Sequence, residues 1–463
     1  MKIAICSPEV FPFAKTGGLA DVAGALPLVL EELGEEVAVM MPAYKCIRQA
    51  GADIRKLNKD ISFSVIGGKT KIYFLENEKL FSREGIYGDK HGDYPDNLER
   101  FSFYCRGALK LLKEIGFAAE IIHLHDWQAC LIPVYLKDKY SSDDFYRRTK
   151  TLLTIHNLGY QGIFPKEEFA GLGLDKKTFG INGLEYYGKI NLLKGGLLYA
   201  DLINTVSPAY SREIQTEELG FGLQGILKNQ SNRIFGILNG VDYKIWDPRT
   251  DRHITRNYSA LDPGPKAENK AELQKICGFK ADPGVPLFAI VSRLAEQKGF
   301  DILSEAIDAI CAMRLQLVIL GEGEAKYRQL LQKAAKKHAQ NISVHFKFDE
   351  PLAHQIYAGA DIFVMPSRYE PCGLGQLIAY KYGAIPLVFK TGGLADTVTD
   401  KSGFVFERYH KDDLIREFAR GVEAFRDKKS WAALVRQAMQ FDYSWVESGK
   451  KYLELYRKAV EVR

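Results

Sequence analysis

The second half of the chain alternates short apolar runs with amphipathic stretches, and this rhythm constrains the fold more than any other feature. Apolar runs with the length of buried strands occur at residues 287–291, 315–320, 343–346, 361–365 and 385–389. Stretches with helical periodicity separate them, at residues 299–312, 324–338, 351–358 and 373–382. Apolar strands that alternate with helices form a parallel sheet covered on both faces. We therefore predict a doubly wound α/β domain that binds its ligand at the carboxyl ends of the strands.

The first half shows the same alternation less regularly. Strand-like runs occur at residues 3–6, 37–41, 121–125, 151–155 and 202–206, and residues 17–33 have the apolar periodicity of a helix. The stretch 243–285 is rich in Pro, Asp and Arg, is regular only near 266–276, and is typical of a connector. The sequence thus predicts two Rossmann-like domains, at residues 1–242 and 243–440, followed by a terminal segment at 441–463 with a helix at 445–462.

A seven-residue segment occurs twice. Residues 15–21 read Lys-Thr-Gly-Gly-Leu-Ala-Asp, and residues 390–396 repeat these letters, each time after an apolar run and before a helix-like stretch. A Gly-Gly pair at such a junction lets backbone N–H groups approach a phosphate closely, whereas an ordinary βα turn does not explain the duplication. Neither segment is a GxGxxG or P-loop motif, which argues against a dinucleotide oxidoreductase or a P-loop enzyme. We expect two matching ligand loops that face each other across a cleft.

Charged residues follow two strands of the second predicted domain. Arg293 and Lys298 come after residues 287–291, where a diphosphate would lie over the carboxyl edge of the sheet. Cations that merely faced solvent at a helix start would oppose the helix dipole, so the ligand interpretation is favoured. Glu370 follows residues 361–365 and precedes glycines. It is placed equally well to accept hydrogen bonds from sugar hydroxyls and to satisfy free N–H groups of a helix start.

Histidines end two strand-like runs of the first predicted domain. His123, His125 and Asp126 are residue types of a metal site, but on a strand the two histidines share one face while Asp126 begins the next loop. A fourth ligand is missing from the neighbouring sequence, so we expect core or ligand-facing histidines rather than a metal site. His156 follows residues 151–155, and this strand-end position favours a ligand role over a structural one.

Composition and charge narrow the class of protein. A net charge of +5 over 463 residues, without a long basic run, does not indicate a nucleic-acid partner. The seven cysteines form no CxxC pair, which favours free thiols in a reducing compartment. The first residues lack the pattern of a signal peptide, and the apolar runs are too short to cross a membrane. We therefore expect a cytoplasmic protein that binds neither nucleic acid nor membrane.

These motifs, in this order, closely resemble the bacterial and plant type of glycogen/starch synthase, and the resemblance runs from the first residue to the end of the chain. The segments that carry it are residues 15–22, 125–127, 154–157, 236–242, 292–299 and 366–374. The resemblance implies a retaining glycosyltransferase of the two-lobed GT-B fold that transfers glucose from ADP-glucose to the non-reducing end of an α-1,4-glucan such as glycogen. It implies no metal and no other cofactor, and a terminal helix that crosses back to the first lobe.

The resemblance also implies roles for individual residues. His156, Arg293, Lys298 and Glu370 would be catalytic, with the two cations on the diphosphate, and Phe348 would stack on adenine. The residues expected to bind substrate are Lys15, Gly17, Gly18, Asp21, Tyr94, Asp126, Asn239, Phe348, Cys372, Gly373, Leu374, Thr391, Gly392 and Gly393. Many retaining GT-B enzymes carry a second glutamate eight positions after the first, where this chain has Ile378. That departure puts a mechanism with two glutamates in doubt.

Two other classes of function stay open at this point. A regulatory protein could bind nucleotide sugar or glucan without turnover, although such a protein would be expected to lose Lys15, Arg293, Lys298 or Glu370. Another transferase of the same fold, such as a sucrose-type synthase or a phosphorylase, is the second alternative; a phosphorylase needs a cofactor lysine and a much longer chain. The residues alone do not choose between ADP-glucose and UDP-glucose, or between a one-step and a two-step retaining mechanism.

Overall fold

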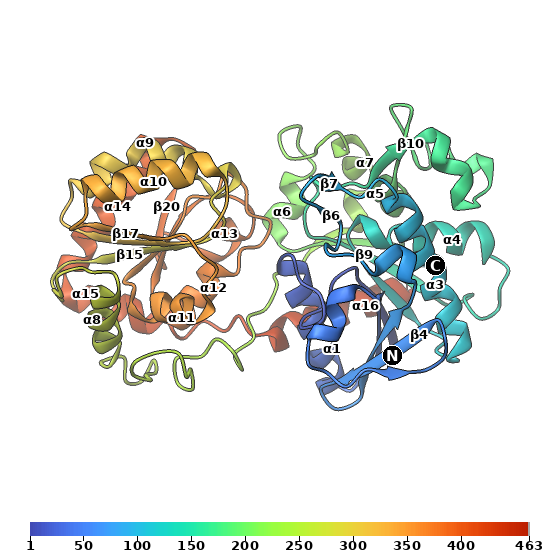
Figure 1. The fold of residues 1–463 in the computed structure, drawn as a ribbon, viewed down its shortest axis with the longest axis horizontal. Coiled ribbons are helices and arrows are strands. Elements are labelled where there is room, and N and C mark those ends of the chain that lie inside the picture. Colours follow the sequence, from blue (N-terminus) through green and yellow to red (C-terminus); the bar gives the residue numbers. More distant parts are fainter. Residues whose placement is uncertain (462–463) are drawn as a thin grey trace. The chain divides into compact units, whose positions relative to one another are not determined.

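Two sheets, one in each of two units, organise the chain in the computed structural model, which describes residues 1–461 (Figure 1). The first unit comprises Met1–Leu238 and the segment that begins at Trp445, and the second comprises Asn239–Ser444. These boundaries lie a few residues from the expected ones at 242 and 440. Asn239, which was expected in the N-terminal domain, belongs to the second unit, and its backbone N–H donates to the Cys372 thiol there.

The first unit contains a nine-stranded sheet in the order β14-β13-β9-β8-β1-β2-β5-β4-β3. Its strands are β1 (Lys2–Cys6), β2 (Glu36–Pro42), β3 (Arg55–Lys56), β4 (Ile61–Ile66), β5 (Thr70–Leu75), β8 (Ile121–His125), β9 (Lys150–Ile155), β13 (Leu202–Thr205) and β14 (Ile234–Gly236). The central strand β1 pairs in parallel with both neighbours, so that Ile3 lies opposite Val37 and Ile121. Successive connections leave β1 in opposite directions, which creates a switch point between β1 and β8 at the carboxyl edge.

One edge of this sheet departs from the predicted parallel arrangement. Strand β4 is antiparallel to β5, and β3 is antiparallel to β4. Ile66 pairs with Thr70 across a turn that contains Gly67 and Gly68. So short a connection cannot hold the crossover that parallel strands require. Short antiparallel pieces that were not predicted complete the unit: β6 (Gly88–Asp89) with β7 (Gly92–Asp93), and β10 (Ile163–Pro165) with β12 (Lys189–Asn191) and β11 (Glu185–Tyr186).

Helices cover both faces of the first sheet. They are α1 (Gly18–Glu32), α2 (Glu78–Phe81), α3 (Asn97–Glu114), α4 (Leu131–Lys139), α5 (Leu192–Tyr199), α6 (Pro208–Glu213), α7 (Gln224–Asn229) and α16 (Trp445–Glu461). The C-terminal helix α16 packs against α1 and reaches strands β8 and β9, while α4 packs against both α3 and α5. A Cβ at Gly449 of α16 would lie 2.5 Å from Val29 of α1, so glycine permits the close approach of these two helices.

The second unit contains a six-stranded sheet in the order β17-β16-β15-β18-β19-β20, in which every pair is parallel. Its strands are β15 (Leu287–Val291), β16 (Gln316–Leu320), β17 (Ile342–His345), β18 (Ile362–Met365), β19 (Ile385–Phe389) and β20 (Phe404–Phe406). The strand order reverses between β15 and β18, and a doubly wound sheet binds its ligand at the carboxyl ends of such a pair. The predicted doubly wound fold is therefore confirmed for this unit.

Helices lie on both faces of this second sheet (Figure 1). They are α8 (Lys266–Ile276), α9 (Phe300–Cys311), α10 (Ala325–Lys337), α11 (Glu350–Gly359), α12 (Gly375–Lys381), α13 (Gly392–Thr397), α14 (Lys411–Arg426) and α15 (Lys428–Ala438). Helices α9, α10 and α14 cover one face, and α8, α11 and α12 cover the other. Helix α12 begins later than the expected start at 373, because Gly373 has a φ of +72° that a right-handed helix cannot contain.

The cysteines and the apolar helices were both subjects of expectations from the sequence. All seven cysteines are free thiols, and five of them are buried. Among residues 1–461, the structure contains no helix that is both long and apolar enough to span a bilayer.

Candidate active site

Asp126 occupies the carboxyl end of β8 in a strained backbone conformation. Its φ of 55° and ψ of −175° lie in a region that is otherwise populated almost only by glycine. The Asp126 N–H donates to the carbonyl of Thr154 at 3.0 Å, and Asp126 Oδ1 accepts from the His156 N–H at 2.7 Å. Burial raises the pKa of Asp126 to about 7, against the effect of that His156 hydrogen bond. Strain of this kind persists where the surrounding structure enforces it, which is typical of functional sites.

His156 lies at the end of β9, next to Asp126, and its ring is neutral at physiological pH. Burial lowers its pKa to about 3, and the rings of His123 and His125 have lowered pKa values for the same reason. A neutral imidazole offers one N–H donor and one acceptor nitrogen. Among residues 1–461 no group of three or more His, Cys, Asp or Glu side chains could hold a metal ion.

Glu9 links the first glycine loop to the loop that contains Tyr87, and the sequence analysis did not identify it. Its buried carboxylate accepts hydrogen bonds from the backbone N–H and the hydroxyl of Thr16, the latter at 2.7 Å, and from the Tyr87 hydroxyl at 2.6 Å. Glu9 is the third residue after the first strand, so the strand-end rule that selected His156 could have found it. Tyr87, by contrast, is 78 residues away in sequence and had no local signal.

Lys15 and Asp21, both predicted to bind substrate, form an exposed ion pair at 2.7 Å across the first glycine loop. Tyr94, also predicted, lies between two guanidinium groups, with Arg83 4.8 Å and Arg100 5.0 Å from its ring centroid. Its hydroxyl oxygen accepts a hydrogen bond from the Gly85 N–H at 3.2 Å. The first unit thus places Glu9, Asp126 and His156 around the switch point of its sheet, with the Lys15 loop attached through Glu9.

The two loops that meet at the switch point of the second unit are packed together. The Arg368 N–H donates to the Gln297 carbonyl at 2.9 Å, and a Cβ at Gly299 would lie 2.0 Å from the Pro366 carbonyl oxygen. This contact holds Lys298, at the end of η6 (Glu296–Lys298), 2.5 Å from Glu370 Oε2. The Ser367 hydroxyl donates to the same oxygen at 3.0 Å. The Glu370 carboxylate therefore pairs with the Lys298 ammonium group in this structure. Its alternative expected role was to accept hydrogen bonds from the N–H groups of a helix N-terminus.

Arg293 follows β15 at the same carboxyl edge. Its side chain is exposed and makes no hydrogen bond or ion pair within residues 1–461. A guanidinium without a partner among residues 1–461, at the carboxyl edge of a sheet, is well suited to an oxyanion. Phe348, in the loop between β17 and α11, is 90% exposed, so its ring is available for stacking.

The remaining predicted residues of the second unit lie in the segment after Glu370, at Asn239 and in the second glycine loop. Cys372 is buried, and burial raises the pKa of its thiol to about 12, so it does not supply a thiolate at neutral pH. The Asn239 side-chain oxygen is buried without a partner among the described residues. Gly373 and Leu374 lead into α12, and Thr391 precedes α13.

The two copies of the repeated segment have different surroundings. A Cβ at Gly17 or Gly18 would meet no atom within 4 Å, whereas one at Gly392 or Gly393 would lie 2.0 Å from the carbonyl oxygen of Glu370 or Cys372, respectively. The Gly393 N–H donates to the Glu370 carbonyl at 3.1 Å. The expectation that both loops keep their amides free is therefore wrong for Gly393. The glycines of the first loop have open space around them, and those of the second pack against the Glu370 segment.

We predict opposite effects of alanine at the equivalent positions of the repeat. Gly393→Ala should lower the free energy of unfolding by about 2 kcal/mol or more, because the new methyl group collides with backbone. Gly18→Ala begins α1 in open space and should leave stability unchanged or raise it slightly, since alanine favours helix. Urea unfolding of both variants measures the difference. Equal losses of stability would contradict the assignment of different roles to the two loops.

Both halves of the chain are similar to known protein families. Residues 2–229 match the family model described as the starch synthase catalytic domain, and residues 276–436 match that of glycosyl transferases group 1. The glycogen synthase of Geotalea uraniireducens (strain Rf4) is 50% identical over 479 residues, an alignment that covers 99% of each chain. The chain belongs to the glycogen/starch synthase family.

Solved structures agree with membership of this family. The catalytic domain of starch synthase IV from Arabidopsis thaliana, bound to ADP and acarbose, superposes with a TM-score of 0.88 at 31% identity and covers 99% of each chain. Sucrose-phosphate synthase from Thermosynechococcus elongatus reaches a TM-score of 0.62 at 17% identity, with 98% of each chain covered, and shows the fold alone. The predicted GT-B fold and the predicted glycosyltransferase class are confirmed.

Ile378 stands at the position where many retaining GT-B enzymes carry a second glutamate. Ile378 is buried within α12, among the apolar side chains of the second unit's core. A carboxylate at this position would be buried there, at a free-energy cost. Glu370 is therefore not joined by a second acid at this place.

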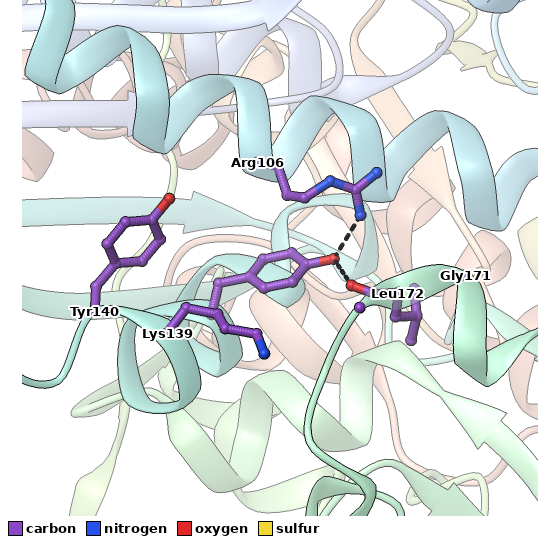
Figure 2. Close-up of a pocket in the computed structure, with 7 residues that line it drawn as sticks. Arg106, Lys139, Tyr140, Gly171 and Leu172 are labelled. Carbon is purple, nitrogen blue, oxygen red and sulfur yellow. Dashed lines mark hydrogen bonds between the residues drawn. The ribbon is translucent and has the colours of Figure 1, made fainter.

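A surface cavity of about 220 Å³ in the first unit lies apart from these residues (Figure 2). It is lined by Arg106 of α3, by residues at the end of α4 and by the end of η3 (Lys166–Leu172). Arg106 donates to the Tyr135 hydroxyl at 3.0 Å, and that hydroxyl donates to the Leu172 carbonyl at 2.9 Å. None of the predicted site residues lines this cavity, and we assign the site to the strand ends instead.

Proposed function

We propose that the chain elongates glycogen by retaining transfer of glucose from ADP-glucose to the non-reducing end of an α-1,4-glucan. The observation that carries the proposal is the cationic surface at the switch point of the second unit. There the Arg293 side chain has no partner among residues 1–461, and Lys298 is held in place by Glu370. Two cations of this kind match a diphosphate, and full-length identity of 50% to a glycogen synthase supports a glucan acceptor.

The reaction breaks the bond between the sugar's anomeric carbon and the diphosphate, and forms a bond from that carbon to an acceptor hydroxyl oxygen. Negative charge develops on the leaving phosphate, where Arg293 and Lys298 stabilise it. Positive charge develops on the sugar, which an ionised Asp126 would stabilise. The acceptor proton passes to the departing phosphate oxygen on the same face of the sugar, which retains configuration without a protein base.

ADP-glucose is the proposed donor for two reasons. The related starch synthase IV structure was obtained with ADP bound, and the exposed Phe348 ring offers a stacking surface for a purine base. The proposed mechanism routes no step through a metal. We also place the reaction in the cytoplasm, which the free thiols of all seven cysteines support.

A donor-by-acceptor assay tests the proposal. Purified protein is incubated with glycogen and radiolabelled ADP-glucose, UDP-glucose or glucose 1-phosphate, with and without EDTA. We expect label from ADP-glucose to enter glycogen, ADP to be released, EDTA to have no effect, and β-amylase to remove the label as maltose. Loss of activity with EDTA and its return with Mg²⁺ would contradict the metal-free mechanism, and turnover of UDP-glucose alone would contradict the donor.

The same assay separates the enzyme from a protein that only binds these ligands. Isothermal titration with ADP-glucose measures binding without turnover. Binding in the absence of any glucosyl transfer, to glycogen or to maltohexaose, would show a regulatory protein and overturn the proposal.

A further inference from the structure

A buried layer of polar side chains lies next to Asp126 and His156, and the proposed reaction does not use it. Three strands and the C-terminal helix contribute to it. Its members are His123 and His125 on β8, Thr154 on β9, Asn204 on β13, and Tyr452 and Tyr456 on α16, all without measurable exposure. Buried polar groups are normally hydrogen-bonded, so the bonds within this layer show which groups are satisfied.

His123 uses both of its ring nitrogens. Nδ1 lies 2.8 Å from the Tyr456 hydroxyl, and Nε2 lies 2.7 Å from Oγ1 of Thr154. The His123 ring also packs against the His125 ring, with 4.2 Å between the centroids. His123 thus links α16 to β9 and supports one face of the His125 ring.

His125 uses only one ring nitrogen. Its Nδ1 lies 2.9 Å from Nε2 of His156, while its Nε2 is fully buried and has no partner among residues 1–461. Two arrangements of protons fit this contact. If His156 donated, the proton of His125 would sit on Nε2 as a buried N–H without an acceptor. If His125 donates from Nδ1, its Nε2 is left with only an unused lone pair.

The second arrangement is favoured, because buried donors without partners are rarer in proteins than buried acceptors without partners. We infer that His125 is a positioning residue that donates from Nδ1 to Nε2 of His156 and so holds the His156 proton on Nδ1. Nδ1 of His156 has no hydrogen-bond partner within residues 1–461. His156 therefore presents an N–H donor, and its use toward a sugar hydroxyl rests on the proposed function.

Histidine tautomers are observed directly by long-range ¹H–¹⁵N correlation in protein labelled with ¹⁵N-histidine. The chain has nine histidines, and the His156 signals are assigned as those lost in His156→Gln. In the unaltered protein we expect Nδ1 of His156 to have the chemical shift of a protonated nitrogen and Nε2 that of an unprotonated one. The reverse pattern would overturn the inference, whether or not the protein transfers glucose.

Two variants of His125 test its role. His125→Phe keeps a ring against His123 but removes Nδ1, and we expect the two His156 nitrogen shifts to move toward each other as the tautomers mix. His125→Asn restores a donor on the atom equivalent to Nδ1, and we expect the original pattern to return. Tyr456→Phe is the matched control, because it removes a hydrogen bond from His123 and leaves the His125–His156 contact in place.

Kinetics of glucosyl transfer complete the test. His125→Phe should lower kcat by about tenfold or more with little change in the KM for the donor, and His125→Asn should recover most of that loss. A merely structural role predicts lower thermal stability in both variants, no recovery by asparagine and unchanged His156 shifts. That outcome would overturn the inference.

Discussion

Lys298→Ala is expected to lower kcat for glucosyl transfer about a hundredfold or more while it changes the KM for ADP-glucose much less. Negative charge on the leaving phosphate grows as the anomeric bond breaks, so a cation aimed at it binds the transition state more tightly than the substrate. Glu370 holds Lys298 at 2.5 Å, and this pre-positioning means that little reorganisation is needed during the reaction. Steady-state kinetics with varied ADP-glucose measure both constants.

Titration of the Lys298→Ala variant with ADP separates lost catalysis from a damaged site. Lys298→Ala leaves the buried Glu370 carboxylate without its cation, which is itself unfavourable. If a damaged site were the whole effect, ADP binding would be lost together with kcat; we expect the Kd for ADP to rise much less than kcat falls. Lys326→Ala, which removes an exposed lysine 3.1 Å from Glu324, should behave like the unaltered enzyme. A normal kcat with a raised KM would demote Lys298 to ground-state binding and leave Lys15 as the better candidate.

Asp126→Asn should make the protein more stable above pH 7 and about a hundredfold less active. The pKa of Asp126 is raised from 3.8 to about 7 in the folded state, so the folded protein binds more protons than the unfolded chain between these values. The free energy of unfolding therefore falls as pH rises from about 4 to about 7. Above pH 7 the whole cost of burying the ionised Asp126 carboxylate remains. Asparagine does not ionise, and it tolerates the positive φ of this position better than most residues do.

Thermal melts and pH–rate profiles check this second prediction together. The difference in Tm between Asp126→Asn and the unaltered protein should be small at pH 5 and should grow toward pH 8. Activity of the unaltered enzyme should rise with pH through an inflection near 7, as the carboxylate ionises, and this inflection should be absent from the variant. A flat profile between pH 6 and pH 8, with no gain in stability, would show that Asp126 does not act through its charge.

The predicted and observed elements agree best where strands are buried on both faces and where helices have a clear periodicity. The apolar run at 385–389 is strand β19, and the periodic stretch at 266–276 is helix α8, with identical bounds. The prediction failed at the antiparallel edge, where β4 alternates buried with partly exposed residues, and at β10, β11 and β12, which are only two or three residues long. Segments that short carry no periodicity to detect.

Candidate site residues were predictable because the carboxyl end of a parallel strand is a local property of the sequence. His156, Asp126, Arg293 and Glu370 each follow an apolar run directly or within a few residues. Their roles as substrate contacts stay predictions until the variants are measured. The partners of these residues were not predictable, because His123 and Tyr456, for example, are separated by 333 residues and meet only in the folded chain.

The sequence by itself determined the fold class, the family and the edge of each sheet at which chemistry-bearing residues lie, because these depend on periodicity and on strand ends. Only the tertiary structure decided what each residue contacts there. Identical letters at 17–18 and 392–393 became an open loop and a packed one, since different backbone segments approach them. The ion pair of Lys298 with Glu370, the strain and raised pKa of Asp126, and the histidine contact that selects a tautomer likewise arise from residues that folding brings together.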